Sequence, residues 1–239
     1  NFSPSFYFHW ADFNNEEVLD WKRIGANLLS IPMAHQMIGY YSIADDKDET
    51  LKVLRSYQYF AVTKIWEKVR ATNWDDHNHR GGFIWHTTGS GKTMTSFKAA
   101  QLIAKAGDAD KVVFLLDRIE LSTQSADEYR GFANADDNVL DTENTQNLIR
   151  VLESDDKDEN LIVTSIQKMS RITRENHVPQ SVISKINDKR LVFIVDECHR
   201  SVTGSGRDSG SGMLLTIKNT FPRAILFGFT GTPIFPENA

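Results

Sequence analysis

The spacing of hydrophobic and polar positions along the chain follows two different patterns, and the pattern changes after about residue 71. Before that point, apolar residues recur at helical spacing over Asn14–Leu29 and over Leu51–Ala71, which predicts two amphipathic helices. The polar run Ala44–Thr50 separates them. We therefore expect a short, mostly helical segment over residues 1–50, the remnant of a preceding domain, and a second unit over residues 51–239.

The second unit contains short apolar runs rich in β-branched and large residues. Stretches long enough to form helices lie between most of these runs. Near-continuous apolar strands that alternate with helices are typical of a parallel sheet covered on both faces. The pattern thus predicts an α/β domain with a mainly parallel sheet. The predicted strands are Gly82–His86, Val112–Leu116, Leu161–Ser165, Leu191–Val195 and Ala224–Phe229.

Composition places the chain among soluble globular proteins. Of its 239 residues, 40% are hydrophobic and 25% are charged. The single cysteine, Cys198, excludes an internal disulfide and fits a reducing compartment. The most apolar early stretch, Leu28–Tyr41, is too short and too interrupted by polar residues to span a membrane, and no secretory signal opens the chain. We expect a cytoplasmic protein with no membrane partner.

The net charge of −5 is not that of a protein that binds nucleic acid over a broad surface. A protein that holds phosphates along one edge needs only a local basic strip, however. The basic residues do gather in local groups: Lys168, Arg171 and Arg174; Lys185, Lys189 and Arg190; Arg200 and Arg207.

A glycine-rich loop, His86–Thr93, follows the first predicted strand and precedes a helix-like run, Met94–Ala106. Small residues let backbone N–H groups close around phosphates, and the N-terminus of the helix adds partial positive charge. Lys92 can reach the β- and γ-phosphates of ATP, and the Thr93 hydroxyl can bind Mg²⁺. His86 departs from the general pattern, which has glycine at that position. The predicted nucleotide-binding residues of the loop are Thr88, Gly89, Ser90, Gly91, Lys92 and Thr93.

Two adjacent carboxylates, Asp196 and Glu197, follow the apolar strand Leu191–Val195. Ligands of open α/β sheets bind at the carboxyl ends of the strands. Asp196 is expected to hold Mg²⁺ through its water shell, and Glu197 to orient and deprotonate the attacking water. With Lys92 they form the predicted catalytic set. Adjacent Asp and Glu fit a GTPase or a small-molecule kinase poorly.

The two motifs, with three others in the expected order, resemble those of the superfamily-two helicases and translocases, whose second motif reads Asp-Glu-x-His. The others are the runs Val113–Leu121, Val163–Lys168 and Gly228–Pro233. The resemblance implies DNA contacts by the first two and coupling of hydrolysis to movement by the third. The implied DNA-binding residues are Arg118, Thr164, Gln167 and Lys168, and the implied coupling residues are His199, Thr230 and Thr232.

Gln58 stands upstream of the loop, where that superfamily keeps a glutamine that recognises adenine. A side-chain amide can donate to adenine N7 and accept from its N6 amino group, a pairing that guanine does not offer. A further expectation concerns the strand before Thr230. Because Thr230 must respond to events between Lys92 and Glu197, its strand should lie between theirs.

The amino-acid sequences of the motifs are similar to those of the R subunit of type I restriction enzymes, in which a histidine such as His86 is usual. The segments that carry the likeness are Gly81–Thr93, Asp196–Ser201 and Gly228–Pro233. The likeness implies a RecA-like P-loop domain that uses ATP and Mg²⁺, acts on double-stranded DNA and joins methyltransferase and specificity subunits. It also implies that the nuclease domain, the second RecA-like domain and an arginine that completes the ATP site lie outside these residues.

Two alternatives stay open at this point. One is another superfamily-two motor, such as an RNA helicase or a DNA repair or remodelling translocase. The other is a regulatory module that binds nucleotide without hydrolysing it, although such modules often lose a residue that is present here. The histidines other than His86 and His199 lack the spacing of a metal site, and the five tryptophans are typical of packing rather than base stacking.

Overall fold

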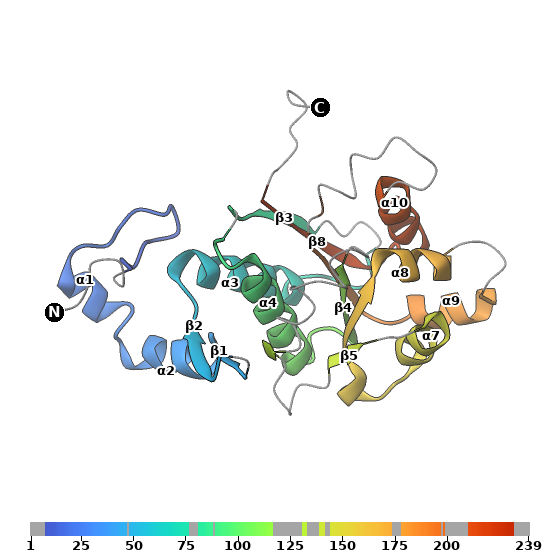
Figure 1. Cartoon of the computed structure of the whole chain (residues 1–239), viewed down its shortest axis with the longest axis horizontal. Coiled ribbons are helices and arrows are strands. Elements are labelled where there is room, and N and C mark those ends of the chain that lie inside the picture. Colours follow the sequence, from blue (N-terminus) through green and yellow to red (C-terminus); the bar gives the residue numbers. More distant parts are fainter. Residues whose placement is uncertain are drawn as a thin grey trace, which may run out of the picture.

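A six-stranded parallel sheet forms the centre of the molecule in a computed structural model (Figure 1). Its strand order is β3-β8-β7-β4-β6-β5. The strands are β3 Gly82–Trp85, β4 Lys111–Leu116, β5 Val139–Asp141, β6 Leu161–Ser165, β7 Leu191–Val195 and β8 Ile225–Thr230. The structure describes residues 8–46, 48–76, 81–87, 89–116, 131–132, 139–141, 144–173, 178–196, 198 and 210–231.

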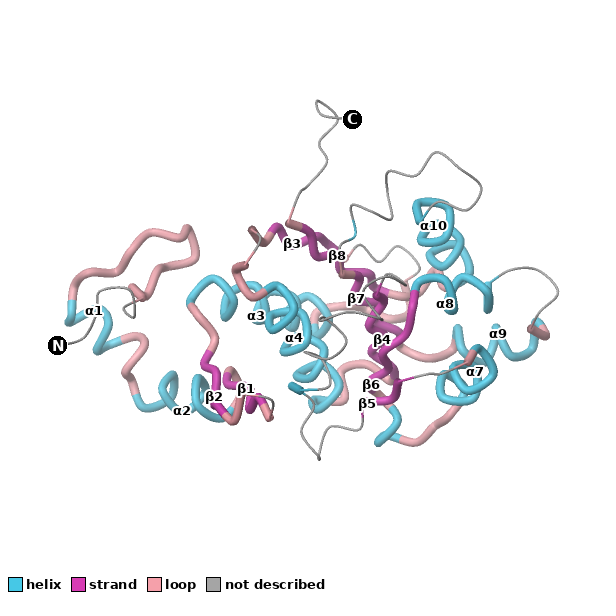
Figure 2. The backbone as a smooth tube through the Cα atoms, viewed as in Figure 1, coloured by secondary structure: helices cyan, strands magenta, loops and turns pink. Residues whose placement is uncertain are grey.

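Helices cover both faces of this sheet (Figure 2). Side chains of β4 alternate between the two layers, with Phe114 facing one and Val113 and Leu115 facing the other. Every residue of β4, β6 and β7 is buried, as expected for central strands of a doubly covered sheet. One layer contains α3 Ser56–Arg70 and α4 Lys92–Ala106. The other contains α7 Thr145–Glu153, α8 Ile166–Thr173, α9 Gln180–Asn187 and α10 Gly210–Thr220. A short 3₁₀ turn, η2, spans Lys157–Glu159.

The predicted α/β class is therefore confirmed, and each of the five predicted strands is present to within one residue at either end. β8 lies between β3 and β7, as its proposed coupling role required. Trp85 is in register with Thr230, and Val195 is in register with Gly228. The three-residue edge strand β5 was not predicted, because its short sequence shows no clear apolar alternation.

The predicted helix over Asn14–Leu29 is wrong in its first half. The Asp12 carboxylate accepts the N–H groups of Asn14 and Glu16, which folds these residues into a tight turn instead of a helix. A helix, α1 Trp21–Ala26, begins only after Asp20, whose side chain caps it, and α2 Ile31–Gly39 follows. The segment is thus helical in part, with a turn where the longer helix was expected.

The predicted helix over Leu51–Ala71 begins at Ser56, because the residues before it form a strand. That strand, β2 Thr50–Val53, pairs antiparallel with β1 Ser42–Asp45. The Nζ of Lys98 in α4 donates to the carbonyl of Ser42 at 2.7 Å and ties the hairpin to the main domain. The proposed division after residue 50 falls inside this hairpin, and the assignment of residues 1–50 to a preceding domain remains a prediction.

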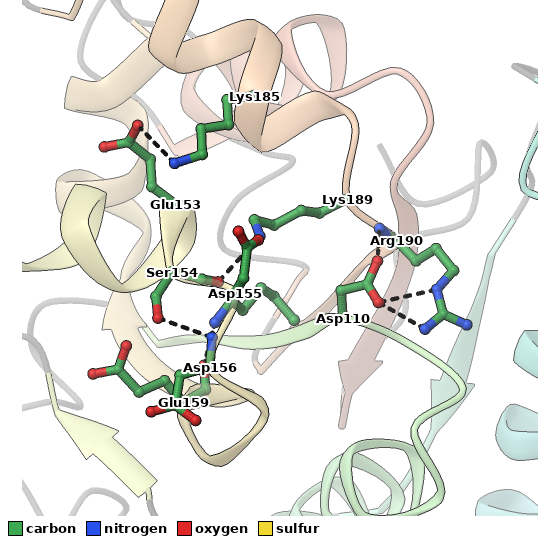
Figure 3. A network of polar contacts seen from close by, with 10 residues as sticks. Asp110, Glu153, Ser154, Asp155, Asp156, Glu159, Lys185, Lys189 and Arg190 are labelled. Carbon is green, nitrogen blue, oxygen red and sulfur yellow. Dashed lines mark hydrogen bonds and ion pairs between the residues drawn. The ribbon is translucent and has the colours of Figure 1, made fainter.

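Lys185, Lys189 and Arg190, one of the basic groups in the sequence, lie near the amino end of β7, away from the carboxyl edge at which ligands bind (Figure 3). Arg190 pairs with Asp110 at 2.6 Å, Lys189 with Asp155, and Lys185 with Glu153 at 3.8 Å. The acidic partners neutralise this group, so it does not form the basic strip that phosphate binding would require.

No helix in the described part of the chain combines the length and the apolar character needed to cross a membrane.

Candidate nucleotide-binding site

The glycine-rich loop joins the carboxyl end of β3 to the N-terminus of α4, the arrangement that binds phosphates. Gly89 and Gly91 have φ angles of +79° and +77°, a left-handed conformation that side-chain-bearing residues rarely adopt. A Cβ on Gly91 would also lie 2.5 Å from the Nε2 of Gln58, so the Gln58 side chain would have to move. The loop's glycines are therefore dictated by its shape. Thr88 lies outside the described residues.

Lys92 and Asp196 meet at this end of the sheet, although they are distant in sequence. The Nζ of Lys92, the first residue of α4, lies 3.4 Å from the Oδ1 of Asp196. Asp196 follows β7, is only 2% exposed, and donates its backbone N–H to the carbonyl of Leu115 at the end of β4. A lysine and a buried carboxylate so placed can hold a phosphate and its counter-cation.

Thr93 and Asp196 supply the donor types that Mg²⁺ prefers, a hydroxyl and a carboxylate. Thr93 lies in the first turn of α4, next to Lys92. Among the described residues, no group of three or more His, Cys, Asp or Glu side chains could hold a metal ion by itself. A magnesium ion here would take its remaining ligands from phosphate oxygens and water, which fits its usual preference for several waters. Glu197 lies outside the described residues.

Helix α3 holds the loop from the side. The Tyr57 hydroxyl donates to the carbonyl of Ser90 at 2.9 Å. The Gln58 Nε2 donates to the carbonyls of Ser90 and Gly91 at 3.2 and 3.3 Å, and its Oε1 accepts the Arg55 N–H at 2.9 Å. Gln58 is thus in the expected region, with both ends of its amide bonded to the protein, while its contact with adenine remains a prediction. Sequence reasoning missed Tyr57, although it is adjacent to Gln58.

His86 is also part of this site, although it was noticed in the sequence only as a departure from the loop pattern. It is 5% exposed, and its Nδ1 lies 2.9 Å from the Ser90 hydroxyl oxygen. Burial, and then the nearby charge of Lys92, lower the pKa of His86 to about 4. The imidazole is therefore neutral at physiological pH.

Thr230 ends β8, is buried, and accepts the His86 N–H through its carbonyl at 2.9 Å. One of the predicted coupling residues thus contacts the strand end from which the phosphate loop begins. The other two, His199 and Thr232, lie outside the described residues.

The predicted DNA-contacting residues of the run Val163–Lys168 lie at the carboxyl end of β6 and the start of α8. This is the same edge of the sheet as the phosphate loop, because the strands are parallel. Gln167 and Lys168 are half-buried, whereas Thr164 is fully buried, and the N–H of Lys168 donates to the Ser165 hydroxyl. DNA contact by these residues remains a prediction, and Arg118 lies outside the described residues.

A cavity of about 610 Å³ adjoins the loop and is large enough for a nucleoside. One wall comes from the N-terminal segment, through Asn15, and this contribution was not predicted. No sequence pattern connects Asn15 with a residue of the loop; only the tight turn that replaced the expected helix brings it there. The other lining residues are Arg55, Tyr57, Ala61, Ile84, Trp85, His86, Thr87, Gly89 and Ser90.

Comparison with known proteins agrees with this geometry. Residues 57–239 match the sequence model of the SWI2/SNF2 ATPase family. The chain is 37% identical over 235 residues to the endonuclease subunit of the type I restriction enzyme SauCOLORF180P of Staphylococcus aureus (strain COL). The match covers 98% of this chain and 23% of that relative. The chain therefore spans less than a quarter of that relative's length.

A shorter relative is matched over almost its whole length. It is the C-terminal part of the type I restriction enzyme MpnIIP endonuclease subunit of Mycoplasma pneumoniae, 35% identical over 204 residues, with 82% of this chain and 94% of the relative covered. Among solved structures, the Sulfolobus solfataricus SWI2/SNF2 ATPase core in complex with double-stranded DNA superposes with a TM-score of 0.53 at 16% identity. The match covers 83% of this chain and 34% of that one, and it supports the RecA-like fold. The sequence matches and the geometry of the loop together show that the chain belongs to the SWI2/SNF2 ATPase family, among the endonuclease subunits of type I restriction enzymes.

Proposed function

We propose that this chain is the ATP-binding motor domain of a double-stranded DNA translocase that serves a type I restriction endonuclease. The observation that carries the proposal is the approach of Lys92 to Asp196 at the N-terminus of α4. A conformationally restricted glycine loop, a lysine and a buried carboxylate at one sheet edge are the parts that phosphoryl transfer from ATP requires.

Each residue has a distinct role in this proposal. Lys92 and the loop N–H groups bind the β- and γ-phosphates, and Thr93 and Asp196 hold Mg²⁺, which when bound would neutralise charge on the phosphate oxygens. Glu197 orients the attacking water and takes its proton. Thr230 ends β8, and in this proposal it transmits the state of the site to the rest of the motor together with His199 and Thr232.

We propose in addition that Arg118, Thr164, Gln167 and Lys168 lie along the DNA path, and that the full protein acts in the cytoplasm with methyltransferase and specificity subunits. The position of β6 supports the first point, since its carboxyl end lies at the same edge as the ATP site. Contacts to the DNA backbone are electrostatic, so binding should weaken with salt.

Binding of Mg·ATP, measured by calorimetry on the chain with and without Lys92→Ala, tests the proposal. We expect the unchanged chain to bind Mg·ATP and Lys92→Ala to lose binding on the order of ten- to a hundredfold, because a charged contact to the phosphates is removed. Equal binding by both proteins would contradict the proposed site. Duplex DNA binding, measured at several salt concentrations and in the Lys168→Ala variant, tests the proposed DNA path separately.

A further inference from the structure

Ser90, at the tip of the phosphate loop, is held from three directions. Its carbonyl accepts hydrogen bonds from the Tyr57 hydroxyl and from Gln58, and its hydroxyl lies 2.9 Å from the Nδ1 of His86. The first two contacts come from α3, whereas the third comes from the loop's own first residue. Of these three contacts, only the one with His86 involves the Ser90 side chain, whose hydroxyl also contacts the carbonyl of Thr87.

The direction of that hydrogen bond follows from proton accounting. The Ser90 hydroxyl has one hydrogen, which it donates to the carbonyl of Thr87 at 2.7 Å. The hydroxyl oxygen therefore accepts from His86, so the neutral imidazole carries its proton on Nδ1. Burial and Lys92 keep the ring neutral, and no second positive charge is added beside Lys92.

His86 is fixed in turn to β8. Its backbone N–H donates to the carbonyl of Thr230 at 2.9 Å, one step beyond the register pair Trp85 and Thr230. Its ring packs 6.2 Å from the ring of Phe229 and 5.7 Å, edge to face, from that of Tyr57. His86 thus connects the end of β8 with the tip of the loop. Its φ is not positive, so a side chain is tolerated where the general loop pattern has glycine.

We propose that His86 is a positioning residue of the phosphate loop, which it holds in its binding shape through Ser90 and ties to the end of β8. The proposal deepens the proposed function, since it concerns the same ATP site. It differs from a packing role in one respect: the donor on Nδ1, not the volume of the ring, sets the position of Ser90.

Two substitutions separate the donor from the ring. His86→Phe keeps a ring against Tyr57 and Phe229 but removes the donor, whereas His86→Asn removes the ring but places an amide nitrogen where Nδ1 was, one bond from Cγ. We expect His86→Phe to weaken Mg·ATP binding about three- to tenfold, the range of one net hydrogen bond. His86→Asn should bind close to the unchanged chain.

Ser90→Ala supplies the matched control. If His86 acts through Ser90, His86→Phe should have no further effect in the Ser90→Ala background, because the acceptor is already gone. Mg·ATP dissociation constants of the four proteins, with thermal melts to show that each is folded, complete the cycle. Additive effects, or binding by His86→Phe equal to that of the unchanged chain, would overturn the proposal.

Hydrogen exchange on the nucleotide-free chain gives a readout that does not depend on ATP. Loss of the donor should speed exchange of the Ser90 and Gly91 amides in His86→Phe but not in His86→Asn. If neither the unchanged chain nor Lys92→Ala binds Mg·ATP, the proposed function fails. The role of His86 is then decided by the exchange pattern alone. Equal exchange in the two variants would overturn it.

Discussion

The sulfur of Cys198 lies against the backbone of Gly228, so close that a Cβ atom on Gly228 would be 2.8 Å from it. Cys198 lies two residues after Asp196, and Gly228 is the residue of β8 in register with Val195 and Phe83. Burial, and then the charge of Asp196, raise the pKa of the Cys198 thiol, so it packs as a neutral group. The side chain of Cys198 therefore packs directly on β8, beside the strand that leads to Asp196.

Gly228→Ala should disturb both the fold and the ATP site. The new methyl group would push against Cys198, which lies two residues after Asp196, at a cost of roughly 1–3 kcal/mol in stability. We expect a lower melting temperature and weaker Mg·ATP binding. The double variant Gly228→Ala with Cys198→Ala removes the nearest atom and should recover part of both losses. A single variant as stable and as active as the unchanged chain would show that the contact has no consequence.

Lys92 and Glu197 should differ in what they contribute. Lys92→Ala removes a contact with the phosphates before reaction, so binding falls. Glu197→Gln keeps the shape of the side chain but removes the base, so binding should persist while turnover falls by about 10²–10⁴. Both are measured by Mg·ATP affinity and by phosphate release in the full-length protein. Loss of binding in Glu197→Gln would mean that this residue acts on the ground state instead.

Much of the fold was predictable because the strands are buried on both faces. Runs such as Leu191–Val195 contain only apolar residues and are followed by Asp196, so the strand and the position of this carboxylate at its carboxyl end could be predicted. The turn at Asp12 was not predictable from helical spacing, since a single carboxylate that accepts two N–H groups decided it. The contacts of His86 and Asn15 at the site depend on how distant segments pack, which spacing along the chain does not report.

Arg190 and Asp110 should contribute stability that depends on pH. Burial opposes ionisation of Asp110, but hydrogen bonds from the side chain and backbone of Arg190 outweigh it and hold the pKa of Asp110 below its ordinary value. A carboxyl with a depressed folded-state pKa stabilises the fold above the unfolded pKa of about 3.9 and loses that effect as pH falls through the folded value.

Asp110→Asn should therefore lower the free energy of unfolding near neutral pH, and the difference should shrink as pH falls below about 4. Both side chains are 38% exposed, so solvent screening limits the effect to about 1 kcal/mol or less. Urea unfolding at several pH values measures it. Glu67→Gln, which breaks the exposed pair with Lys64, is the control and should change stability less at every pH. A difference that grows on acidification would contradict the assignment.

Gln58 allows a final prediction in which two roles give different results. As an anchor of the loop, its amide donates to Ser90 and Gly91, so Gln58→Ala should weaken binding of any nucleoside triphosphate by the same factor. As the residue that recognises adenine, it should in addition favour ATP over GTP, and the substitution should reduce that preference. Tyr57→Phe is the matched control, since it removes another hydrogen bond to Ser90 but leaves the amide of Gln58 in place.

The dissociation constants of Mg·ATP and Mg·GTP for the three proteins decide between the two roles of Gln58. We expect Gln58→Ala to lose both affinity and preference, and Tyr57→Phe to lose affinity alone. Equal loss of ATP and GTP affinity in Gln58→Ala, with the preference intact, would leave Gln58 as a loop anchor and exclude it from base recognition.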